Sequence, residues 1–258
     1  MSLTTFSKFY YGQIVDGISF ALDFSEGGPE LAASIPIGDY TLSSLILEVK
    51  TQMDAVGGQS YEISVDRDTR LITISAPGNF ELLVDTGTRE GSSVYELLGF
   101  TGADRTGSNS YTGDSPSGSE YVPQFILQDH IASENFKNFI DPEVNVSSSG
   151  EVEVVKFGNQ EFIQMNIKYA TDEEQPKIGP IRNNPTGLQD LRDFMDFAIE
   201  KNKLEYMPDR SDSATFETVL LEKTPEESKG TGYKLKELYN ENLPLYFDTG
   251  ILLFRKVN

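Results

Sequence analysis

The sequence predicts a β-rich α+β protein of two domains, each a mostly antiparallel sheet or sandwich covered by one or two helices. Alternating apolar and polar residues, the pattern of half-buried strands, recur along the whole chain. The length of 258 residues exceeds the usual size of a single domain. A polar stretch rich in glycine and serine, residues 101–121, divides the chain near its middle. We therefore expect domains at residues 1–122 and 123–258.

The first half begins with a predicted strand over residues 17–24, in which Ile18, Phe20, Leu22 and Phe24 share one parity. A helix is expected after Thr41, a suitable N-cap residue, and before Gly57, a suitable stop. Its apolar residues at helical spacing are Leu42, Leu45, Ile46, Val49 and Met53. This helix should present one face to a core.

Three further strands and a second helix are predicted before residue 101. Residues 61–65 and 71–75 alternate around an Asp- and Thr-containing turn and predict a β-hairpin. Residues 80–84 add another alternating run. Residues 92–100 predict a short helix that ends at Gly99. The first domain is thus expected to be a sheet with two helical covers.

The second half predicts the order β, α, β. Residues 122–140 indicate a strand and then a short helix that carries Phe136 and Phe139. Val144 and Val146 should face Val152 and Val154 across a hairpin. The later elements are a strand at 163–169, a helix at 187–202 capped by Thr186, a strand at 216–221, a short helix at 234–239 and a strand or hairpin at 243–256.

Composition narrows the classes of function. The formal charge of −20 repels phosphate backbones and anionic lipid surfaces, so direct nucleic-acid binding is disfavoured. This acidity serves either solubility or a surface to which passing DNA must not adhere. Without cysteine, the chain has no disulfides or thiolate metal sites, and it suits a reducing cytoplasm. The first residues lack a long apolar run, so we expect neither secretion nor membrane insertion.

The sequence contains no recognisable catalytic constellation. Its one histidine, His130, would have to serve any Ser-His-Asp triad or zinc site. Carboxylates are plentiful, so a glycosidase-like acid pair stays open without a motif to support it. Asp66 and Asp68 depart from a calcium-loop pattern and are better interpreted as turn residues. The segment 230–232 lacks the context of a phosphate-binding loop. We expect no enzyme, no cofactor and no bound metal.

Residues 101–121 have the composition of a linker or of an arm that becomes ordered on a partner. The aromatic residues Tyr111 and Tyr121 would supply the apolar contacts of such an arm, and they are the candidate assembly residues. A passive linker is the alternative. On either interpretation, we expect residues 104–119 to be removable without loss of folding.

Two stretches of the first half carry a resemblance to a known class. Residues 37–45, IGDYTLSSL, precede the predicted helix and hairpin, and residues 97–100, LLGF, close the domain. This pattern resembles a module of virion structural proteins of tailed bacteriophages. The second half is similar to phage particle proteins in residues 178–180, 191–195, 205–209, 246–250 and 254–255.

The resemblance implies a tail, baseplate or neck component, with a second domain like those of tail-tube and distal-tail proteins. It implies a homo-oligomeric ring around the DNA channel, contacts with other tail or neck proteins, no catalytic residue and no membrane partner. The protein would be made in the host bacterial cytoplasm and reside in the virion, and DNA would pass an acidic lumen without specific binding. The sequence shows no unmistakable long hairpin of the kind that bridges tube subunits, which leaves the position along the tail open.

A different class of function also stays open. A carbohydrate-binding or carbohydrate-active host-recognition protein of a phage would stack exposed aromatic rings on sugars, with Tyr111 and Tyr121 as the candidates. Its acidic residues would bond sugar hydroxyls, or cleave glycosidic bonds if two carboxylates lie at a suitable separation.

Overall fold

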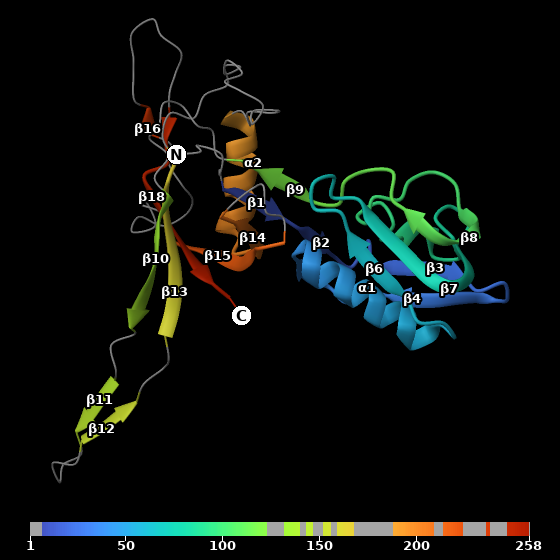
Figure 1. Ribbon diagram of the computed structural model, residues 1–258, viewed down its shortest axis with the longest axis horizontal. Helices are drawn as coiled ribbons and strands as arrows, with labels where there is room; N and C mark the ends of the chain where they lie inside the picture. The colour runs from blue at the N-terminus through green and yellow to red at the C-terminus, as the bar shows by residue number, and fades with distance from the viewer. Residues whose placement is uncertain are drawn as a thin grey trace, which may run out of the picture. The chain divides into compact units, whose positions relative to one another are not determined.

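The computed structural model describes residues 7–122, 132–139, 143–146, 152–155, 159–167, 188–208, 214–223, 236–237 and 247–257. It confirms a β-rich α+β fold with antiparallel sheets (Figure 1). The chain divides into two compact units. The N-terminal unit contains Lys8–Tyr121 and Asn202–Phe216, and the C-terminal unit contains Val122–Lys201 and Glu217–Asn258 together with Met1–Ser7.

The units are therefore not the two consecutive domains, 1–122 and 123–258, that the sequence suggested. Residues 202–216 return to the N-terminal unit because β14 (Leu204–Met207) pairs with β1 (Lys8–Tyr11), for example at Lys8 opposite Met207. β1 pairs on its other side with β9 (Ser119–Tyr121). Pairing between segments this distant in sequence leaves no local pattern to read.

The main sheet of the N-terminal unit is antiparallel and is built around one long strand, β7 (Ile72–Leu82). β7 pairs with β6 (Glu62–Val65), β3 (Ala21–Ser25) and β8 (Arg105–Thr112), and β3 pairs with β4 (Glu30–Ser34). The β6–β7 pairing confirms the predicted hairpin. The predicted runs 71–75 and 80–84 overlap this single strand at residues 72–75 and 80–82.

Helix α1 (Leu42–Val56) covers one face of this sheet (Figure 1). Thr41 caps it as predicted: its side chain accepts a hydrogen bond from Ser44 N, and the Ser44 hydroxyl accepts one from Thr41 N. Gly57 closes the last turn through a bond from its N–H to the Met53 carbonyl. The buried residues of α1 are Leu42, Leu45, Val49 and Met53.

Aromatic rings connect the strands below this helix. Phe24, Tyr61, Phe80 and Tyr111 form a row of edge-to-face contacts, with successive ring centroids 5.4, 5.3 and 5.0 Å apart. Each such pair adds about 0.5–1.5 kcal/mol beyond the burial of its area. The row links β3, the residue before β6, β7 and β8 into one core.

Two predictions for the first half are wrong. The short 3₁₀ helix η1 (Glu90–Ser92) ends where the helix predicted at 92–100 should begin, and residues 95–99 form turns instead of a helix, although Phe100 is buried as expected. The strand predicted at 17–24 begins only at Ala21, and Ile18 lies in an exposed loop. Before it, β2 (Gln13–Val15) pairs with β5 (Gly38–Tyr40) as a separate ribbon.

The C-terminal unit has the strand order β10 (Ala132–Phe139), β13 (Asn159–Asn166), β18 (Ile251–Lys256) and β15 (Glu217–Lys223). Helix α2 (Leu188–Ile199) lies within the range predicted for it, whereas its predicted cap Thr186 is outside the described residues. Buried residues on the sheet and helix are Ile163, Met165, Val219, Leu221, Leu252, Phe254, Leu188, Leu191, Phe194, Met195 and Ala198.

Two short ribbons complete this unit. β11 (Glu143–Val146) and β12 (Val152–Val155) pair with Val144 opposite Val154 and Val146 opposite Val152, which confirms the predicted hairpin. β16 (Lys236–Glu237) pairs with β17 (Phe247–Asp248). The helices predicted after residue 122 and at 234–239 are wrong where the chain is described, because β10 and β16 are strands.

None of the helices formed by the described residues combines the length and apolar character that a membrane-spanning helix needs.

Candidate functional site

The first candidate residue, Tyr111, belongs to the core of the N-terminal unit. It lies in β8 with 9% of its surface exposed, its hydroxyl donates a 2.7 Å hydrogen bond to the Phe80 carbonyl, and it accepts one from Ser108 N. The expectation of an exposed arm residue is wrong. The reason is that β8 is a polar strand held by backbone pairing with β7, which composition does not reveal.

The second candidate, Tyr121, is also buried, with 1% of its surface exposed. It lies in β9, opposite Phe9 of β1, and so belongs to a different sheet from Tyr111. The structure does not bring the two tyrosines into one site. Neither ring offers a face on which a sugar could stack.

Polar contacts tie the rest of residues 101–121 to the same unit. The Asp114 carboxylate accepts a hydrogen bond from Thr101 N and is ion-paired with Arg105. The Gly99 carbonyl accepts bonds from the N–H groups of Asp114 and Ser115, and the Ser117 hydroxyl donates to the Leu97 carbonyl. The segment is therefore integrated in the N-terminal unit, not a free linker.

Among the buried acids that the structure describes, Asp23 is joined to an arginine. Its carboxylate accepts bonds from Arg89 N at 2.9 Å and Arg89 Nε at 2.8 Å, and Arg89 also donates to Ser34 Oγ. The side chain of Asp23 is 3% exposed. This ion pair connects β3 to the loop after β7, and it therefore stabilises the fold.

The second buried acid, Glu205 of β14, forms a matching arrangement with Arg67. Its side chain has no exposed surface, its Oε2 pairs with Arg67 and its Oε1 accepts a 2.9 Å bond from Ser43 N. The Arg67 guanidinium also lies 3.8 Å from the ring centroid of Phe216. Burying a carboxylate is costly unless it is paired in this way. Glu205 thus joins the returning segment to the start of α1.

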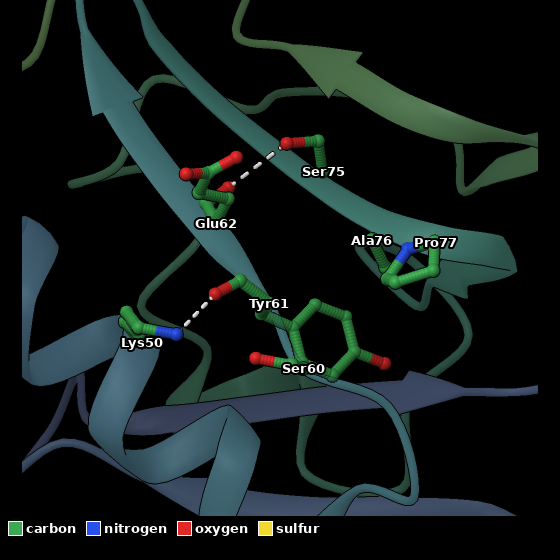
Figure 2. A pocket seen from close by; sticks show the side chains of 7 residues that line it. All are labelled: Lys50, Ser60, Tyr61, Glu62, Ser75, Ala76 and Pro77. Atoms are coloured by element: carbon green, nitrogen blue, oxygen red, sulfur yellow. Dashed lines mark hydrogen bonds between the residues drawn. The ribbon is translucent and has the colours of Figure 1, made fainter.

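An open hollow of about 420 Å³ lies between α1, the start of β6 and the middle of β7 (Figure 2). It is lined by Lys50, Ser60, Tyr61, Glu62, Ser75, Ala76 and Pro77. The Lys50 ammonium donates to the Tyr61 carbonyl and, at 2.7 Å, to Asp54 Oδ2. Burial raises the pKa of Asp54, but bonds from Lys50 and Tyr61 N outweigh it and lower the pKa overall.

The side chains of Lys50 and Ser75, which line this hollow, form hydrogen bonds within the N-terminal unit. Ser75 Oγ donates to the Glu62 carbonyl at 3.1 Å, a contact drawn in Figure 2 with that of Lys50. These bonds secure a strand end and a helix side chain, and they do not form a nucleophile with its base. Asp66 acts as the predicted turn residue, accepting bonds from Asp68 N and Thr69 N. His130 lies outside the described residues, among which no cluster suits a metal ion.

Sequence reasoning missed an exposed surface on the β2–β5 ribbon. Ile14 pairs with Asp39 and Val15 with Gly38, so Ile14 and Asp39 share a face opposite to the buried Val15. Asp16 and Ile37, one residue beyond the ribbon, continue that alternation, and Ile18 follows. The exposed fractions are 44% for Ile14, 73% for Ile37 and 70% for Ile18. We call these five residues the Ile/Asp face.

The turn that presents Ile18 is fixed by Asp16. The Asp16 carboxylate accepts 2.8 Å bonds from the N–H groups of Ile18 and Ser19, and these bonds lower its pKa. Asp39 accepts a 2.7 Å bond from Lys203 N. The Lys203 ammonium also lies 4.0 Å from Asp39 Oδ1, so the Ile/Asp face carries two carboxylates with one lysine beside them. The adjacent apolar residues Ile14 and Val15 gave no indication of which one faces solvent.

The sequence matches none of the family models of known proteins, and none of the curated proteins is significantly similar to it.

Proposed function

We propose that the protein is a structural component of a tailed-bacteriophage virion, in the tail, baseplate or neck, and that it assembles as a ring through contacts between copies. The observation that carries the proposal is a nested hairpin in the C-terminal unit. β11 and β12 lie in sequence between β10 and β13, and both strand pairs are antiparallel.

The residues that connect the two strand pairs lie outside the described ones, and each pair has its own antiparallel register. The outer pairs run from Ala132 opposite Met165 to Phe139 opposite Asn159, and the inner pairs end at Val146 opposite Val152. The four strands are labelled in Figure 1. The sequence shows no unmistakable long hairpin of the kind that bridges tube subunits. The two antiparallel pairs support the tail interpretation.

The ribbon of β11 and β12 would be stabilised by contact with another chain. By register, Val144, Val146, Val152 and Val154 occupy one face, and β11 and β12 pair only with each other among the described strands. A two-stranded ribbon is at best marginally stable in water unless another element covers it. In a ring, a neighbouring copy would cover this face. Repeated head-to-tail contacts form a closed ring when a whole number of the rotations between neighbouring copies makes one full turn.

Charge also favours this function over one that requires attraction to DNA. The chain has 41 acidic and 21 basic residues. A ring of such subunits would present an acidic channel past which DNA can move without binding. The buried acids Asp23 and Glu205 are committed to arginines, which suits a rigid structural subunit.

Sedimentation velocity of the full chain, with immunodetection in purified particles, tests the proposal. We expect a single closed oligomer and a particle-associated protein. The double variant V144T/V154T keeps β-branched side chains while making the shared face polar, and it should weaken assembly. V155T, on the opposite face of the ribbon, is the matched control. A strictly monomeric protein absent from particles would contradict the proposal.

A further inference from the structure

We propose that the Ile/Asp face binds the lysine-containing segment 229–236 of a second copy of this chain, in a head-to-tail contact. The inference rests on the proposed ring and names one of its contacts. It starts from an unusual surface: Ile18 and Ile37 are each more than two-thirds exposed and stand beside two carboxylates.

The face is built as a unit. A side-chain carbon placed on Gly17 would lie 3.8 Å from Ile37 Cδ1, so Ile37 extends over the Gly17 backbone. Asp16 holds the turn that carries Ile18, and ribbon pairing fixes Ile14 beside Asp39. The isoleucines are therefore displayed by ordered backbone. Exposed apolar groups rimmed by polar ones are typical of protein interaction sites.

Charge selects the kind of contact. In a two-fold symmetric contact the face would meet itself, and its two carboxylates, which outnumber the one ammonium of Lys203 beside Asp39, would approach those of the other copy. Like charges facing each other oppose binding. In a head-to-tail contact the face meets a different surface, which must supply cations together with apolar groups.

The chain itself contains such a segment. Residues 229–236, KGTGYKLK, hold three lysines and no acid, and no other eight residues of the chain include three cations. Tyr233 and Leu235 alternate with Lys234 and Lys236, so cationic and apolar groups occur together. Residues 229–235 lie outside the described residues, and Lys236 begins β16. Their chemistry complements the Ile/Asp face.

Photo-crosslinking tests the contact directly. A benzophenone amino acid replaces Ile18 in the full chain, and isotopically light and heavy copies are mixed before irradiation. Cleavage after Glu227 and after Glu237 should release residues 228–237, joined to a peptide of the other isotope. The same probe at Leu47, 65% exposed on α1, is the control and should not capture that peptide. A probe at Ile37 repeats the test if the first variant misfolds.

A second measurement separates this contact from the ring. D16N/D39N removes two charges, one of them the partner of the Lys203 ammonium, while each asparagine retains an acceptor for the bonds to Ile18 N, Ser19 N and Lys203 N. We expect weaker association and a shallower dependence on salt. I18S/I37S should weaken association about tenfold or more for each isoleucine, whereas L47S should not.

The outcomes distinguish the two proposals. Crosslinks only within one copy, or only to other peptides, overturn the contact, and if assembly is unchanged the ring proposal stands. Crosslinks to 228–237 in open chains of variable length support the contact and contradict a closed ring. A wild-type protein that stays monomeric contradicts both.

Discussion

The Glu205 carboxylate lies at the N-terminus of α1, where its Oε1 accepts a 2.9 Å hydrogen bond from the backbone N–H of Ser43, a residue 162 positions earlier in the chain. Its other oxygen is ion-paired with Arg67. An anion is favourable at a helix N-terminus because the first N–H groups have no partner within the helix. Glu205 thus couples the capping of α1 to the return of residues 202–216.

The variant E205Q should therefore destabilise the N-terminal unit. It keeps the size of the side chain but leaves the Arg67 guanidinium, whose side chain is 12% exposed, without its counter-charge. Breaking a buried pair by removing one partner costs about 3–5 kcal/mol. Urea unfolding monitored by tyrosine fluorescence measures the loss. E96Q changes an exposed carboxylate and should stay within about 0.5 kcal/mol of wild type. Equal stability of the two variants would contradict the role assigned to Glu205.

A pair of glycine variants tests the turn at the end of residues 92–100. Gly99 has φ of +85°, and an added Cβ would lie 2.0 Å from the Ser115 carbonyl oxygen. Gly102 has φ of +73° but has nothing within 4 Å of that position. G102A should cost about 1–2 kcal/mol from the left-handed backbone alone. G99A should cost about 2–5 kcal/mol because a backbone clash is added. Similar losses in thermal unfolding would argue against the close approach to Ser115.

The sequence predicts α1 well because its information is local. Thr41, the apolar spacing and Gly57 each act within a few residues, and all three appear in the structure as expected. The β6–β7 hairpin is predictable for the same reason. β8 is not, since its residues are polar and its pairing with β7 depends on segments far apart in sequence.

The candidate site was predicted less well than the fold. The polar neighbours of Tyr111 and Tyr121 suggest an exposed arm. In β8, however, the Tyr111 ring is buried although the rest of the strand is polar. The Ile/Asp face was missed because the predicted strand at 17–24 assigned Ile18 to the core. Side-chain exposure at a strand end depends on register, which the sequence alone does not determine.

The Gln59 side chain bonds the backbone of β7 where the strand has no partner in β6 or β3, and the variant Q59L tests this role. Its Oε1 accepts a 2.7 Å bond from Gly78 N, and its Nε2 donates a 3.3 Å bond to the Asn79 carbonyl. These bonds lie between the part of β7 that pairs with β6 and the part that pairs with β3. Q59L should speed hydrogen exchange at Gly78 and cost about 1–3 kcal/mol.

The surface variant Q52L is the control for Q59L, because Gln52 bonds only the Glu48 side chain among the contacts described for it. It should leave exchange at Gly78 unchanged. If Q59L does not alter exchange there, the amide of Gly78 must have another acceptor, and the proposed role of Gln59 is wrong.

Asp104 should contribute stability that depends on pH. Burial raises its pKa, but bonds from the Thr86 hydroxyl and from the N–H groups of Asp85 and Thr86 outweigh this and lower the pKa below 3.8. Because the folded-state pKa is depressed, the stabilisation is present above pH 3.8 and disappears as pH falls through the folded value. D104N should be less stable than wild type at pH 7, and the difference should shrink in strong acid.

Denaturant titrations at several pH values measure this convergence. D85N alters an exposed neighbouring carboxylate and should follow the wild-type profile throughout. A difference between D104N and wild type that persists undiminished at the lowest accessible pH would show that the charge of Asp104 is not what stabilises the loop.

Variants of Tyr111 distinguish a role in the core from a role in assembly. Removing its hydroxyl leaves the Phe80 carbonyl without this donor, so Y111F should cost about 1–3 kcal/mol, and Y111A about 3–5 kcal/mol through the loss of a buried ring. N109S, an exposed change on β8, should cost less than about 0.5 kcal/mol.

Removal of residues 104–119 should unfold the N-terminal unit, contrary to the expectation from composition, because it deletes β8 and the ring of Tyr111. Unfolding and sedimentation measured on the same samples decide the matter. A Y111A protein with wild-type stability that fails to assemble would restore the arm hypothesis, whereas loss of stability before any loss of assembly supports the core role.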